Sequence, residues 1–184
     1  MARGESAGQF GALERGDRSP ADLHLRPTEG QRSPQGGMET GPRKKYNVDL
    51  VLQGHDHCYS RLSAEAGHEA ALAARAAGAV QGPVYLVSVA GSKMYRLNDR
   101  ARRQPDRVAE DTQFYETVEV ESQRLAVRTY TASGRLYDAF DLLRDAQGGK
   151  HLIEPVANLP AERTCDGEQG PDGLPCTALG NARG

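Results

Sequence analysis

The sequence predicts an α/β domain that is rich in β-strands and has a disordered tail at each end. Three observations support this prediction. Short apolar runs with β-branched residues recur between residues 44 and 144, and Gly and Ser punctuate them. One alanine-rich stretch, residues 63–79, has the composition of a helix. The two ends are rich in polar residues, Gly and Pro, with few apolar residues to bury.

These composition shifts divide the chain into three parts. Residues 1–43 are expected to be a disordered segment, because their few apolar residues show no sustained period. Residues 44–144 form the folded part, and residues 145–184 form a polar C-terminal tail. Three readings of the N-terminal segment remain open: a truncated domain that begins at Pro42, a misassigned start, or an unrelated extension.

Within the folded part, each expected element has its own sequence signal. The first strand is short and apolar, the helix follows it, and a charged loop at 98–111 precedes three strands that alternate apolar and polar residues. Ser122-Gln123 and Ala132-Ser133-Gly134 fit hairpin turns. The expected strands are 48–52, 83–90, 113–121, 124–131 and 135–143.

The stretch at residues 48–61, VDLVLQGHDHCYSR, carries the clearest chemical signal. An apolar strand runs into Gly54, which permits a sharp turn, and His55 and His57 follow with one residue between them. Neutral imidazole is a good ligand for transition metals. Asp56 is a candidate to orient a ligating histidine by accepting its second N–H. The pattern predicts a pair of metal-binding histidines at the end of a strand.

Residues 48–61 resemble the closing motif of the calcineurin-like metallophosphoesterases, especially their purple-acid-phosphatase-like branch. In that motif a strand precedes G-H-x-H, and an aromatic residue and an arginine follow; Gly54, His55, His57, Tyr59 and Arg61 match. Residues 82–97 and 114–142 are similar to later strands of the family, so the resemblance covers roughly residues 44–143.

The resemblance implies the C-terminal part of a metallophosphoesterase β-sandwich that hydrolyses phosphate esters. It implies a centre of two metal ions (Fe, Zn or Mn), with His55 on one ion and His57 on the other. Asp56, Tyr59 and Arg61 become candidates for contacts behind the metal ligands or beside the substrate.

The family's other ligand blocks are D-x-H, G-D, G-N-H-D/E and a lone His. Residues of the right type occur in the N-terminal segment but in the wrong order: Asp17, Asp22 and His24. No G-N-H sequence occurs in the chain. Two histidines without carboxylates should bind metal weakly, because catalytic zinc sites typically use three protein ligands. We therefore expect the isolated chain to be inactive, with the N-terminal half of the domain lost or supplied by a second polypeptide.

Two alternatives to this reading remain. The first is a non-catalytic, β-rich remnant or interaction module with a vestigial metal motif. The second is a protein that binds one metal through His55, His57 and either Cys58 or His68. Lys93 and Arg96 are further candidates to meet a phosphate, although a surface role fits them as well.

Charge and cysteine content set outer limits on function. The formal net charge of −2 gives no electrostatic case for binding nucleic acid or a membrane surface, and no segment is long and apolar enough to span a bilayer. Cys165 and Cys176 bracket a Gly- and Pro-containing loop that can close as a disulfide, which suits an exported parent protein. The N-terminus has no signal peptide, so the sequence leaves the location open.

Overall fold

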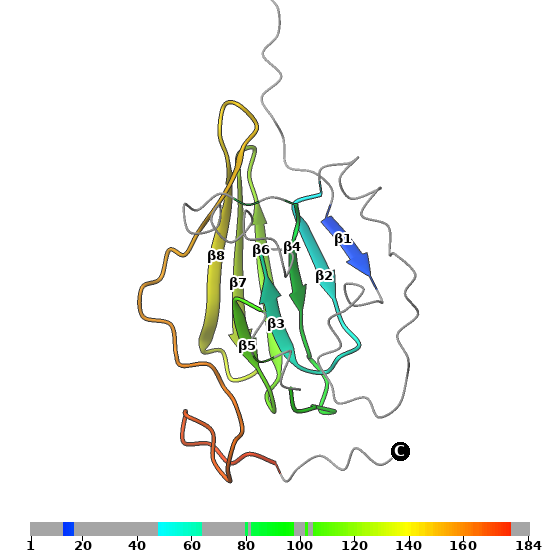
Figure 1. The fold of residues 1–184 in the computed structure, drawn as a ribbon, viewed down its shortest axis with the longest axis vertical. Coiled ribbons are helices and arrows are strands. Elements are labelled where there is room, and N and C mark those ends of the chain that lie inside the picture. Colours follow the sequence, from blue (N-terminus) through cyan, green and yellow to red (C-terminus); the bar gives the residue numbers. More distant parts are fainter. Residues whose placement is uncertain are drawn as a thin grey trace, which may run out of the picture.

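Two β-sheets make up the part of the chain that the computed structural model describes (Figure 1). The described residues are 13–16 (backbone only), 48–63, 80, 82–97, 102 and 105–177. The strands are β1 (Leu13–Gly16), β2 (Leu50–Gln53), β3 (Tyr59–Leu62), β4 (Val84–Val87), β5 (Arg107–Ala109), β6 (Phe114–Val120), β7 (Arg124–Thr131), β8 (Leu136–Arg144) and β9 (Lys150–Ile153).

The first sheet has five strands in the order β1-β2-β4-β3-β5. Strands β1, β2 and β4 run parallel, with Leu50 opposite both Leu13 and Val84. Strand β3 is antiparallel to both of its neighbours, β4 and β5. The carboxyl ends of β2 and β4 therefore lie side by side at one edge of this sheet, where the loop 54–58 begins.

The second sheet is an antiparallel meander in the order β6-β7-β8-β9. The turn after β6 is closed by a hydrogen bond from the Glu121 amide to the Arg124 carbonyl (2.8 Å). The turn after β7 contains Gly134 at φ 84°, a left-handed conformation that glycine adopts without strain. Both turns fall where the sequence places them.

The main core lies between the two sheets. Alternation along β2 directs Leu50 and Leu52 toward the second sheet and Val51 toward the opposite face. The core cluster accordingly combines Leu50, Val84 and Leu86 with Phe140 and Leu142 of β8. A second buried cluster, which includes Val51, Tyr85, Val87 and Val108, occupies the other face of the first sheet. Strand β2 is thus covered on both faces, as its apolar run predicts.

The β-rich character is confirmed, and the expected strands at 124–131 and 113–121 correspond closely to β7 and β6. No helix occurs among the described residues, and most of the expected helix at 63–79 lies outside them. Within the same part of the chain, no helix is long and apolar enough to cross a membrane. The structure therefore supports the β part of the α/β prediction and leaves the α part a prediction.

Parts of both segments that were expected to be terminal tails contribute strands to the fold. Residues Leu13–Gly16 form β1, so that part of the 1–43 segment is ordered through backbone pairing with β2. In the C-terminal tail, Lys150–Ile153 form β9 and Cys165 is bonded to Cys176. Backbone hydrogen bonds and a covalent link order these polar segments, and neither leaves an apolar pattern in the sequence.

The C-terminal segment also lies against the edge of the first sheet. Arg163 forms a parallel bridge with Ala109 of β5, and the Glu110 amide donates to the Arg163 carbonyl (2.9 Å). The Val108 amide donates to the Glu162 carboxylate (3.0 Å). These contacts cover the outer edge of β5.

Candidate functional site

The loop 54–58 occupies the position where parallel sheets commonly bind ligands, beyond the carboxyl ends of adjacent strands. The Ser88 amide donates to the Gln53 carbonyl (3.1 Å), which joins the segments leaving β2 and β4. The strand ends abruptly because the residues after Gln53 leave the extended conformation.

The backbone of this loop is strained at both histidines. His55 has φ 83° and His57 has φ 54°. Residues other than glycine rarely adopt this left-handed region, and each such residue costs about 1–3 kcal/mol unless its surroundings compensate. Two such residues in the five-residue loop 54–58 mark it as a candidate functional site, because strain of this kind clusters where function requires a particular geometry.

His57 is held by the segment that follows β4. Its Nδ1 lies 2.5 Å from the carbonyl oxygen of Lys93, and its own carbonyl accepts a hydrogen bond from the Tyr95 amide (3.0 Å). The ring centres of His57 and Tyr95 are 5.0 Å apart. Because a carbonyl oxygen only accepts hydrogen bonds, Nδ1 must carry the proton, which leaves the lone pair on Nε2. Metal-ligating histidines are usually oriented in this way.

His55 and Asp56 complete the loop with opposite exposures. His55 is exposed, whereas Asp56 has no solvent exposure. Neither carboxylate oxygen of Asp56 has a hydrogen-bond partner, and the same is true of the side-chain amide of buried Gln53. A buried carboxylate without a donor is costly. The loop therefore combines two imidazoles with a buried carboxylate that lacks a hydrogen-bond donor, and these are groups that a cation can bind.

The two later residues of the motif, Tyr59 and Arg61, lie away from the histidine loop in the interior of the fold. Tyr59 and Arg61 project between the two sheets, where both contact Asp138 of β8. The Tyr59 hydroxyl donates to Asp138 Oδ2 (2.7 Å), and Arg61 Nε donates to the same oxygen (2.9 Å). Burial, together with the nearby Asp138, raises the pKa of Tyr59 well above its usual value. These contacts are structural; a role beside the metal or substrate remains a prediction for both residues.

Arg61 also donates to Glu154 (2.5 Å), which follows β9, and its guanidinium lies 5.1 Å from the Phe140 ring centre. The side chain is only 2 % exposed. With these donors engaged, Arg61 ties β3 to β8 and to the segment beyond β9. This network has no local signature in the sequence, because Asp138 and Glu154 lie 77 and 93 residues beyond Arg61.

Cys58 is fully buried, and its thiol donates to the Asp56 carbonyl (3.3 Å). Burial, followed by the charges of Asp56 and Glu110, raises the pKa of this thiol far above its ordinary value. Because metals bind thiolates, this environment disfavours Cys58 as a ligand.

The remaining candidates are placed unevenly. Lys93 contributes its carbonyl to His57, while its ammonium group lies 5.4 Å from the Tyr95 ring centre. Arg96 is partly buried. Asp17, Asp22, His24 and His68 lie outside the described residues. Within the part that is described, no third ligand joins His55 and His57 in a metal-binding cluster.

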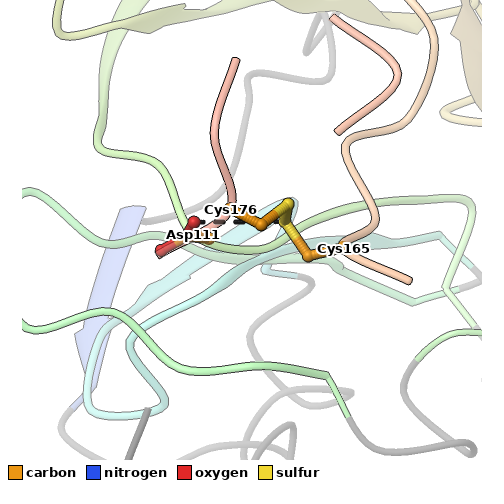
Figure 2. Close-up of side chains that lie close together, drawn as sticks. All are labelled: Asp111, Cys165 and Cys176. Carbon is orange, nitrogen blue, oxygen red and sulfur yellow. Dashed lines mark hydrogen bonds between the residues drawn. A yellow bond between two sulfur atoms is a disulfide. The ribbon is translucent and has the colours of Figure 1, made fainter. Parts of the chain in front are cut away.

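The only group of three potential ligands found among the described residues is Asp111, Cys165 and Cys176 (Figure 2). The two cysteines form a disulfide, with their Cα atoms 5.8 Å apart, so neither offers a thiolate. Asp111 accepts hydrogen bonds from the amide (2.6 Å) and hydroxyl of Thr177 and lies 3.7 Å from Arg163. In this oxidised state the cluster anchors the C-terminal segment and does not form a metal site.

The geometry thus concentrates the candidate site in His55, Asp56 and His57, with the Lys93 carbonyl as a contributor that the sequence did not indicate. A backbone carbonyl 36 residues away has no side-chain signature. No protein-family model, curated protein or solved structure matches this chain.

Proposed function

We propose that this chain carries part of the metal centre of a metal-dependent phosphoesterase, with His55 and His57 as ligands for Fe, Zn or Mn. The observation that carries the proposal is the hydrogen bond between His57 Nδ1 and the Lys93 carbonyl. It presents Nε2 as a ligand nitrogen in a fixed orientation, which is the usual arrangement behind a metal-bound histidine.

Two further features support the same proposal. Both histidines hold left-handed backbone conformations, a kind of strain that is found more often at functional sites than elsewhere. Asp56, which stands between them in the sequence, is buried, and neither of its carboxylate oxygens has a hydrogen-bond partner. A nearby cation would offset the cost of burying that charge, and its loss would leave the loop less stable.

The chemistry that a bound metal pair supplies in such enzymes is activation of water and stabilisation of charge on the phosphate oxygens. This chain contributes ligand orientation and negative charge behind the ligands. Two imidazoles cannot hold two divalent ions on their own, so a substrate-hydrolysing centre needs ligands beyond these two histidines. We therefore infer that the isolated chain does not turn over phosphate esters.

A non-catalytic β-rich remnant or interaction module is the second candidate. It is favoured by one observation: in the described part of the chain, no third side chain joins the two histidines. On this reading the loop geometry persists without a bound metal.

Metal stoichiometry separates the two candidates. The full chain is dialysed against Zn²⁺ or Mn²⁺, and the bound metal is counted by mass spectrometry. We expect weak binding of about one ion per chain, lost in His57→Ala and retained in His151→Ala, since His151 lies on β9 and contacts Asp145 (2.9 Å). Metal content that His57→Ala leaves unchanged would favour the remnant.

A turnover assay tests the inferred inactivity directly. The chain is incubated with p-nitrophenyl phosphate and added Mn, Fe or Zn, and no release of nitrophenol is expected. Turnover that disappears in His57→Ala and persists in His151→Ala would show that this chain holds a complete site.

A further inference from the structure

A cavity of about 310 Å³ lies at the end of the second sheet where the β7–β8 hairpin turns, and neither His55 nor His57 lines it. Its walls come from the β5–β6 loop, the β7–β8 hairpin and the C-terminal segment that the disulfide closes. The volume falls at the lower end of the range for small-molecule sites. Met94, from the segment after β4, adds to the cavity walls, so four segments far apart in the sequence enclose one ligand-sized space.

Much of the lining is apolar. Met94, Leu136, Pro160 and Leu174 all contribute to the walls. Leu174 is 52 % exposed, one of the few large apolar side chains left open to solvent among the described residues. An occupant with an apolar body would cover this side chain and gain hydrophobic stabilisation from doing so.

The charges around the cavity are unequally compensated. Arg163 is buried and contacts both Asp111 and Asp172, so this end of the cavity is internally paired. Arg135 lines the cavity from the hairpin and is exposed, and its guanidinium contacts no carboxylate among the described residues. The hairpin end is therefore the end that can accept an anionic group from a ligand.

Hydroxyl groups accompany the guanidinium at that end. Thr131 and Ser133 line the same hairpin, and their side-chain oxygens lie 2.9 Å apart. The Arg135 amide donates to the Thr131 hydroxyl oxygen (3.2 Å), which fixes these groups relative to one another. The guanidinium supplies several N–H donors in one plane, which suits a single carboxylate, and the two hydroxyls keep its surroundings polar.

The number of charges favours a monoanion. The four charged groups that line the cavity, Asp111, Arg135, Arg163 and Asp172, cancel one another. A carboxylate adds one negative charge, whereas a phosphate monoester adds nearly two at neutral pH. Two carboxylates already lie on the cavity wall, so the doubly charged ligand is the less favourable one.

We infer that this cavity is a binding site for a small organic carboxylate with an apolar body, held by Arg135 and packed against Leu174 and Met94. The site is separate from the proposed phosphoesterase function and does not depend on it. The disulfide loop forms one wall, so ligand binding and closure of that loop stabilise each other.

The test measures binding of 4-ethylbenzoate to the full chain by ligand-observed NMR titration. Two matched probes, 4-ethylbenzyl alcohol and 4-ethylphenyl phosphate, report on charge. We expect the carboxylate to bind at least threefold more tightly than either. In Arg135→Gln its affinity should fall about fivefold, as loss of a partly exposed ion pair predicts.

Two further variants locate the site. Ala132→Trp places a bulky side chain at an exposed position on the cavity wall and should abolish binding without disturbing the core. Arg124→Gln removes a cation at the opposite end of β7 and should leave binding unchanged. The inference is overturned if 4-ethylbenzoate does not bind at millimolar concentration, if the alcohol or the phosphate binds equally well, or if binding survives in Ala132→Trp.

Discussion

The two halves of one short motif have opposite physical characters. Residues 55–57 form a strained loop with an exposed imidazole and a buried carboxylate that has no hydrogen-bond partner. Two residues later, Tyr59 and Arg61 are buried with their polar groups bonded to Asp138. Features that cost stability mark the first half as a place for function, whereas the second half holds the two sheets together.

The largest test of this contrast is removal of the buried guanidinium. Arg61→Ala leaves Asp138 buried without its main ionic partner, and we expect a loss of about 3–5 kcal/mol in the free energy of unfolding. Urea denaturation measures it. Arg124→Ala is the comparison, because Arg124 is 33 % exposed and its loss should destabilise the protein much less than the loss of Arg61. Equal losses in the two variants would contradict a structural role specific to Arg61.

A smaller loss is expected from Tyr59→Phe, which removes one donor to Asp138 and should cost about 1–2 kcal/mol. The folded-state pKa of Tyr59 is raised, so its contribution is fully present below the unfolded value of about 10 and is lost as pH rises above it. Stability should therefore fall less steeply above about pH 10 in Tyr59→Phe. A residual fall is expected from Tyr137, whose pKa burial raises to about 12. Urea denaturation of both proteins below and above about pH 10 measures how steeply the stability of each one falls.

In the first half of the motif, substitutions should have the opposite sign. Asp56→Asn removes a buried charge that has no hydrogen-bond donor, and the metal-free protein should gain about 1 kcal/mol. The same variant should bind Zn²⁺ more weakly. Thermal denaturation with and without metal measures both effects. A loss of stability in the metal-free variant would mean that the Asp56 carboxylate is satisfied within the fold.

The smallest expected effect concerns the backbone alone. At φ 83°, glycine is favoured over any residue with a Cβ, so His55→Gly should be about 0.5–1 kcal/mol more stable than His55→Ala. Both variants remove the imidazole, and their difference isolates backbone strain. If His55→Ala proved equal or more stable, the loop would not store strain at this position.

The sequence predicted those elements whose signals are local. The apolar run before Gly54 marked β2, and the alternating residues at 113–121 and 124–131 marked β6 and β7. Strand β3 escaped prediction because Ser60 and Arg61 interrupt its apolar character, and only Asp138, 77 residues beyond Arg61, explains why an arginine is buried there. Strand β9 was missed for a related reason, since Lys150 and His151 read as tail.

For the candidate site, the sequence identified the two histidines but not their geometry. The left-handed backbone and the Lys93 carbonyl contact depend on how the segments after β2 and β4 meet, which requires the parallel sheet to form first. The separation of Tyr59 and Arg61 from the loop was equally invisible, because alternation in a short strand does not reveal which face is the interior.

The strip of chain beside β5 has a consequence for solubility. A bare outer strand offers unpaired amides and carbonyls on which another molecule can add a strand, a common start of aggregation. Here Glu162 and Arg163 accept hydrogen bonds from the Val108 and Glu110 amides, so the polar C-terminal segment covers this edge of the sheet. A version of the chain cut before residue 160 would keep both sheets but lose this protection. It should therefore self-associate through the uncovered edge of β5.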